Sequence, residues 1–105
     1  MKIMQRAILK IVPGKSDVAI ELLKKEEEFR NKLGVKPWKA YRCIAGRDAE
    51  DMNTFYFDTE WESLAEFEQF VEKFGSMEEM TSLTEKWKPI VASHEMEIYT
   101  VIENL

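Results

Sequence analysis

Apolar and polar side chains alternate along the first dozen residues of the chain. A period of two residues is typical of a β-strand, in which successive side chains point to opposite faces. Both faces of this strand are largely apolar, so we expect each of them to be covered. One face carries Ile3, Ala7, Leu9 and Ile11, and the other carries Met4, Arg6, Ile8 and Val12.

Two capping-box patterns mark helix starts in the second half of the chain. Ser63 is followed three residues later by Glu66, and Ser76 is followed in the same way by Glu79. In this pattern the serine side chain and the acidic side chain each satisfy a backbone N–H of the first helical turn. Apolar residues at helical spacing follow both boxes. We therefore expect one helix that ends at Gly75 and a second that ends before residue 89.

The remaining pattern predicts an earlier helix and three more strands. Ser16 is expected to cap a helix that Gly34 ends, and strands are expected at about residues 38–45, 54–60 and 94–102, with a polar loop at 46–53. This βαββααβ order is that of a ferredoxin-like α+β fold, an antiparallel sheet with its helices on one face. The uncovered face would measure about 400 Å², near the largest apolar patch that monomers tolerate. A partner should cover it.

Length and composition limit the possible functions. The 105 residues, 45% of them hydrophobic, suit one folded domain over residues 1–105. A net charge of -5 argues against binding to nucleic acid or to an anionic membrane. A single cysteine, Cys43, rules out an intrachain disulfide. No membrane span or signal peptide is evident, so we expect a cytoplasmic protein, and we expect neither a metal nor a cofactor.

Three longer runs carry a resemblance to a known superfamily. They are PGKSDVAIELL, NTFYFDTEWESLAEFEQF and KWKPIVASHEMEIYTVIE. Together they resemble the dimeric α/β-barrel superfamily, and within it the antibiotic-biosynthesis-monooxygenase-like and NIPSNAP-like proteins. The resemblance implies a homodimer in which two sheets close face to face into a barrel. Members of this superfamily include cofactor-independent monooxygenases, small-ring isomerases, haem-degrading and haem-binding enzymes, and many proteins with no assigned activity. The resemblance transfers no catalytic residue to this sequence.

The predicted barrel face combines charged and aromatic groups. On an otherwise apolar face such groups must pair with one another or bind something charged. One hypothesis is a set of salt bridges that fixes the pairing of the two sheets. The other is a pocket in which an arginine holds an anionic small molecule while a tyrosine or an aspartate handles a proton. The candidate ligand-binding residues are Arg6, Arg42, Tyr56, Asp58, Glu97 and Tyr99.

Other chemically active residues are given structural interpretations. The only histidine, His94, is expected at the start of the last strand, and Cys43 is expected to be a small buried hydrophobe. Trp61 and Trp87 fall in phase with the apolar positions of their elements and are expected in the core. The acidic run at residues 26–28 is expected to be a solvated helix face.

Two functions from different classes remain open at this point. One is a monooxygenase-like enzyme that acts, without a cofactor, on a small aromatic or anionic molecule between the sheet and the helices. The other is a non-catalytic dimeric module that binds a small ligand or serves in a stress response. A cavity that touches the candidate polar residues would favour the enzyme.

Overall fold

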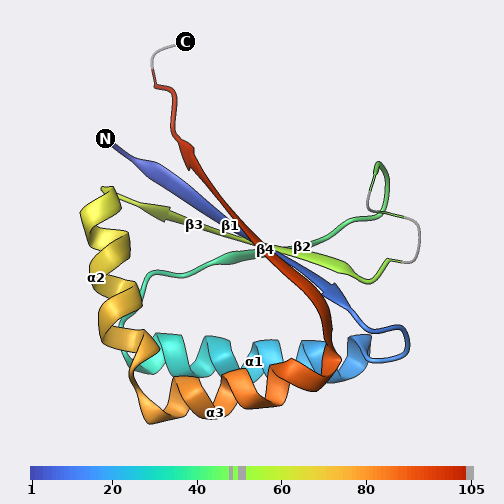
Figure 1. Ribbon diagram of the computed structural model, residues 1–105. Helices are drawn as coiled ribbons and strands as arrows, with labels where there is room; N and C mark the ends of the chain where they lie inside the picture. The colour runs from blue at the N-terminus through green and yellow to red at the C-terminus, as the bar shows by residue number, and fades with distance from the viewer. Residues whose placement is uncertain (48, 50–51, 104–105) are drawn as a thin grey trace.

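The computed structural model describes residues 1–47, 49 and 52–103, and it has an antiparallel sheet with the helices on one side (Figure 1). The predicted ferredoxin-like α+β fold is therefore confirmed. In chain order the elements are β1 (Ile3–Ile11), α1 (Ser16–Lys32), β2 (Lys39–Arg42), β3 (Thr54–Trp61), α2 (Leu64–Gly75), α3 (Glu78–Trp87), a 3₁₀ turn (Lys88–Ile90) and β4 (Val91–Thr100).

Strand β1 lies inside the sheet, whose strand order is β2-β3-β1-β4. It pairs in antiparallel fashion with β3 on one side and with β4 on the other. Residues directly opposite each other in such a pair point to the same face. The register sets Arg6 opposite both Asp58 and Glu97, and it sets Ala7 opposite Phe57. Because Phe57 is buried in the core shared with α1, odd-numbered residues of β1 face the helices and even-numbered residues face away.

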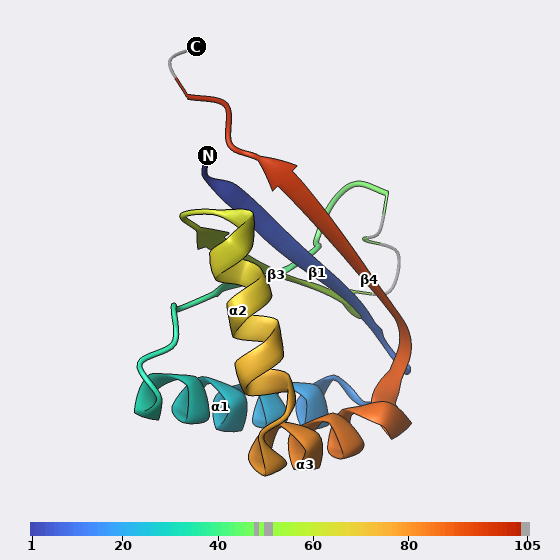
Figure 2. The same ribbon diagram turned by 60° about the vertical axis from the view of Figure 1, so that its left-hand side comes forward.

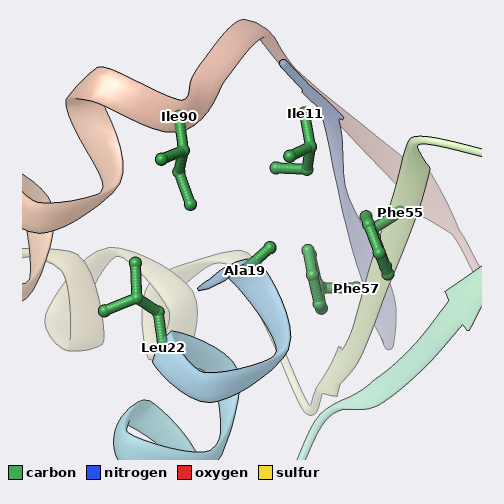
Figure 3. Packing of buried hydrophobic residues seen from close by; sticks show 6 residues of the cluster. All are labelled: Ile11, Ala19, Leu22, Phe55, Phe57 and Ile90. Carbon is green, nitrogen blue, oxygen red and sulfur yellow. The ribbon is translucent and has the colours of Figure 1, made fainter. Parts of the chain in front are cut away.

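The main core lies between α1, the 3₁₀ turn and the helix-facing side of the sheet (Figure 3). It consists of Ile11, Ala19, Leu22, Phe55, Phe57 and Ile90. A second cluster, Ile3, Trp61 and Phe67, lies where α2 packs against β3 and β1. Trp61 is a core residue, as predicted. The two clusters anchor the helices at separate places on one face of the sheet, and α2 runs at a steep angle to α1 and α3 and meets them at its C-terminal end (Figure 2).

The strand boundaries differ from the predictions at β2 and at β4, which covers Val91–Thr100 rather than about 94–102. Strand β2 covers only Lys39–Arg42, although the Cys43 N–H still donates a hydrogen bond to the Thr54 carbonyl (3.2 Å). Residues 48, 50 and 51 of the predicted loop lie outside the described residues. No helix in the described part of the chain has the length and apolarity needed to cross a bilayer.

The three predicted helix caps had different outcomes. Ser63 caps α2 as expected, since its Oγ accepts a hydrogen bond from the Glu66 N–H (3.1 Å). Ser76 does not cap α3, because its hydroxyl donates instead to the carbonyls of the preceding helix and Met77 takes the cap position. Ser16 does not cap α1 either, because its hydroxyl donates to Asn53 Oδ1 (2.7 Å). Both hydroxyls donate to groups outside the helix that they were expected to cap, and neither helix start has a side-chain cap.

We expect Ser63→Ala to lower the free energy of unfolding by about 1 kcal/mol, the usual effect of losing an N-cap acceptor. Urea denaturation at neutral pH measures it. Ser76→Ala is the matched control, because Ser76 precedes α3 without capping it, and it should cost clearly less. Equal losses in the two variants would contradict the assignment of the caps.

Candidate functional site

The helix-free face of the sheet holds a salt bridge at its centre. Arg6 and Asp58 form a two-point ion pair, with Nε–Oδ1 and Nη2–Oδ2 distances of 2.9 Å. The side chains are 34% and 16% exposed, so the pair is partly shielded from water. The hydrogen bond from Arg6 to Asp58 raises the pKa of Arg6, which keeps the guanidinium charged. The pair lies on the face where the sequence predicted charged groups, and it is of the salt-bridge kind that one of the two hypotheses proposed.

Aromatic rings surround this ion pair. The Arg6 guanidinium carbon lies 5.5 Å from the centre of the Tyr56 ring and 5.9 Å from that of Tyr99. The Tyr99 hydroxyl donates a hydrogen bond to the Glu97 carboxylate, which raises the pKa of Tyr99. All of the predicted candidates except Arg42 therefore meet at one place on this face. Whether they bind a ligand stays a prediction.

Arg42 lies at the edge of this cluster, and the strand phase predicted for it is wrong. The register of β2 sets it opposite Phe55, a core residue on the helix-facing side. Its guanidinium carbon lies 4.8 Å from the centre of the Phe55 ring. The sequence pattern assigned Arg42 to the wrong face of the sheet. Strand β2 has only four residues, all of them exposed, so its polarity pattern does not show which side chains face the helices.

A hollow of about 330 Å³ adjoins the Arg6 cluster on the β2 side. Its lining residues are Arg6, Tyr41, Arg42, Cys43, Tyr56 and Asp58. Cys43 is half-buried rather than fully buried as predicted, and its thiol donates to the Ala45 carbonyl (3.3 Å). Arg6 and Asp58 neutralise each other here, and Arg42 adds a further positive charge to the lining.

A larger cavity of about 420 Å³ lies on the opposite side of the sheet, between the sheet and helices α1 and α3. We call it the helix-side cavity. Its volume falls in the range of small-molecule sites in proteins, about 300–1,000 Å³. Its walls are mainly apolar or aromatic, and they comprise Ala7, Leu9, Leu23, Trp38, Phe57, Trp87 and Val91. None of the candidate residues predicted from the sequence lines it.

The polar lining of this cavity includes a buried cation, Arg30. Only 8% of Arg30 is exposed. Its guanidinium carbon lies 4.4 Å from the centre of the Trp38 ring and 5.2 Å from that of Phe70, which is cation–π geometry on two sides. The Nη1 atom is buried and has no hydrogen-bond partner among the described residues. Burial lowers the pKa of Arg30, but a guanidinium remains protonated in proteins.

A carboxyl group, Glu26, lines the cavity one helical turn before Arg30. Burial raises the pKa of Glu26, and the Arg30 charge opposes that rise without cancelling it. A carboxyl group whose pKa is raised by burial is a candidate acid or base. Glu27 and Glu28 are exposed, as expected for the acidic run, whereas Glu26 is not part of a solvated face.

More polar groups complete the lining of the cavity. They are Gln5, Thr59, Thr84, Lys88 and His94. Lys88 is exposed and pairs with Glu85 (2.8 Å), and His94 is an exposed strand residue that borders the cavity. Among the described residues there is no group of three His, Cys, Asp or Glu side chains that could hold a metal ion.

The sequence contained a signal for this site that the apolar pattern obscured. Leu23, Glu26 and Arg30 are spaced by three and four residues, so they share one face of α1 beside the apolar stripe. Glu26 lies in a continuous charged run with two lysines before it and two glutamates after it, and such a run predicts a solvated helix face. The contribution of Trp38 depends on the loop before β2, which no periodicity describes.

Solved structures with the same fold were found over nearly the whole chain. An uncharacterized NIPSNAP-like domain protein from Burkholderia xenovorans superposes with a TM-score of 0.81 at 12% identity, over 97% of this chain and 86% of that one. A NIPSNAP family protein from Agrobacterium tumefaciens gives 0.77 at 16% identity, over 98% and 95%. An antibiotic biosynthesis monooxygenase gives 0.70 at 16% identity, over 95% and 98%.

No family model matches the sequence, and no curated protein matches it. At these identities the structural likeness establishes the fold. The chain therefore has the ferredoxin-like fold that is also seen in NIPSNAP-like and antibiotic-biosynthesis-monooxygenase-like proteins, as its sequence predicted.

We expect Glu26→Gln to stabilise the protein by an amount that grows as the pH rises above the usual pKa range of a glutamate. Burial raises the pKa of Glu26 in the folded chain, so the folded state binds this proton more tightly than the unfolded state. Stability from this group is present at low pH and is lost as the pH rises through the raised pKa. Glutamine avoids that loss because it carries no charge.

Urea unfolding at several pH values measures this effect. Glu27→Gln is the matched control, since Glu27 is exposed on the same helix, and it should show no such trend. A Glu26→Gln variant that is less stable than the parent at pH 8 would contradict the assignment, because it would mean that the ionised carboxylate stabilises the fold.

Proposed function

We propose that this protein binds a small aromatic or anionic molecule in the helix-side cavity and carries out a monooxygenase-like reaction on it, as one half of a homodimer. The observation that carries the proposal is the cavity itself. It joins aromatic walls, a buried cation and a carboxyl with a raised pKa in about 420 Å³. Sites of this composition are the default candidates for ligand binding in a protein of this size.

The monooxygenase-like part of the proposal rests on fold likeness and on chemistry that the cavity could support. A solved structure with this fold is described as an antibiotic biosynthesis monooxygenase. In the simplest reaction of this kind, a base removes a proton from an activated methylene group of the substrate, and the resulting carbanion reacts with O₂. The methylene becomes a carbonyl and the second oxygen atom leaves as water, so the substrate supplies all of the electrons. Glu26 is the base we assign to this step.

The second candidate is a non-catalytic module that binds its ligand in the same cavity. This candidate needs only the cavity and no reacting base, and one fold can serve several functions. The two candidates differ in the expected role of Glu26, which is a catalytic base in the first and a part of the wall in the second.

Homodimer formation is supported by the face of the sheet that the helices leave bare. On this face Tyr99 of edge strand β4 and Tyr41 of edge strand β2 are 40% and 49% exposed. Opposite edges of the bare face also carry opposite charges, with Lys39 on β2 and Glu95 on β4. A two-fold axis parallel to the strands would set each Lys39 near the partner's Glu95. Two copies of this chain are therefore complementary to each other.

Oxygen consumption distinguishes the enzyme from the binding module. Aromatic compounds with an acidic benzylic methylene, supplied with air, should cause O₂ uptake by the parent protein and none above background with Glu26→Gln. The variant should still bind the same compounds, which a thermal shift detects. Binding without O₂ uptake by the parent would support the module instead. Failure of the parent to bind any compound of this class would overturn the proposal.

Sedimentation at micromolar concentration should give about twice the chain mass of 12.4 kDa. Ile8→Glu should convert the dimer to a monomer, because Ile8 points out of the bare face and a charge buried there costs several kcal/mol. The matched control is Val18→Glu, at an exposed position on α1, and it should leave the dimer intact. A monomeric parent protein would contradict the proposed pairing.

A further inference from the structure

The buried Arg30 guanidinium lacks a complete set of partners. It is held between the rings of Trp38 and Phe70, its Nη1 has no hydrogen-bond partner among the described residues, and water hardly reaches it. A buried charge without a close counter-ion costs several kcal/mol, so native structures nearly always supply one. This residue lines the helix-side cavity. A ligand in that cavity could supply the missing anion.

The groups around Arg30 do not provide that anion fully. Glu26 is the carboxyl group nearest to it along α1, and its raised pKa shows that burial weakens its ionised form. Lys88 also lines the cavity, but it already pairs with Glu85. The unmatched charge of Arg30 therefore favours a negatively charged ligand over a positive or neutral one.

The walls define the rest of the ligand. Trp38, which stacks on Arg30, and Trp87 both line the cavity, together with Phe57 and aliphatic side chains of β1. Flat aromatic groups pack well against such rings. A volume of about 420 Å³ suits a ligand of one or a few rings rather than a long chain.

We propose that the helix-side cavity selects aromatic carboxylates, and that Arg30 is the residue that binds the carboxylate group while Trp38 and Trp87 contact the ring. The proposal rests on the proposed function, since it names the ligand class of that cavity. A carboxylate accepts two parallel hydrogen bonds from a guanidinium, which gives direction as well as affinity.

The test compares 2-naphthoate with its neutral analogue 2-naphthamide. The parent protein should bind the acid at least about ten-fold more tightly, the usual gain from hydrogen bonds to a charged group. Titration calorimetry at pH 7 measures both affinities, and quenching of tryptophan fluorescence provides a second readout near the cavity. Arg30→Met should lower the affinity for the acid to that for the amide, and it should leave the amide unaffected.

Two further variants separate the role of Arg30 from general effects. Lys24→Met removes a positive charge from an exposed position on the same helix, where Lys24 pairs with Glu21, and it should keep the preference for the acid. Arg30→Lys keeps the charge without the planar guanidinium, so it should retain part of the preference. If Arg30→Met does not fold, Arg30→Lys tests the role of the guanidinium in its place.

The possible failures are distinguishable. Equal affinity of the parent for acid and amide would overturn the selection of carboxylates but leave the cavity as a binding site. An acid preference that survives in Arg30→Met would overturn the role of Arg30 and point to Lys88 or His94. If the parent binds neither compound, the proposed function fails together with this inference.

Discussion

The pairing of β1 with a strand on each side determines the rest of the structure. Hydrogen bonds to β3 and β4 fix its register, so alternate residues are committed to opposite faces of the sheet. Ala7 and Leu9 are thereby directed to the helix-side cavity, whereas Arg6 and Ile8 are directed to the bare face. A shift of one residue would exchange these sets. The two faces can therefore serve different purposes, one for a ligand and one for a second chain.

Arg6 and Arg30 lie in different electrostatic environments. Arg6 has its counter-ion in the same chain, because the register sets Asp58 directly opposite. Because Asp58 neutralises Arg6, a second molecule can cover this surface without burying an unpaired charge. Arg30 is more deeply buried, and its positive charge is compensated by aromatic faces and by a carboxyl whose ionisation is disfavoured. An incomplete environment of this kind is typical of binding sites, where the ligand contributes the remaining contacts.

The sequence predicted the features that depend on periodicity and local chemistry. The strand alternation in β1 and β3 was strong enough to place Arg6 and Asp58 together, and Ser63 with Glu66 marked the start of α2 correctly. The same reasoning failed for Arg42, because four exposed residues do not determine the phase of β2. It also missed Arg30 and Glu26. Their burial depends on how α1, α3 and the loop before β2 meet, and tertiary packing of this kind leaves no regular pattern in a sequence.

The central claim is that the ligand site and the pairing surface lie on opposite faces of one sheet. Intermolecular nuclear Overhauser effects from bound 2-naphthoate test this directly, because neighbouring residues of β1 report on different faces. The account predicts contacts from the naphthalene protons to the Leu9 methyl groups and to the Trp38 ring. Contacts to Ile8 and to the Tyr56 ring instead would place the ligand on the bare face and contradict the account.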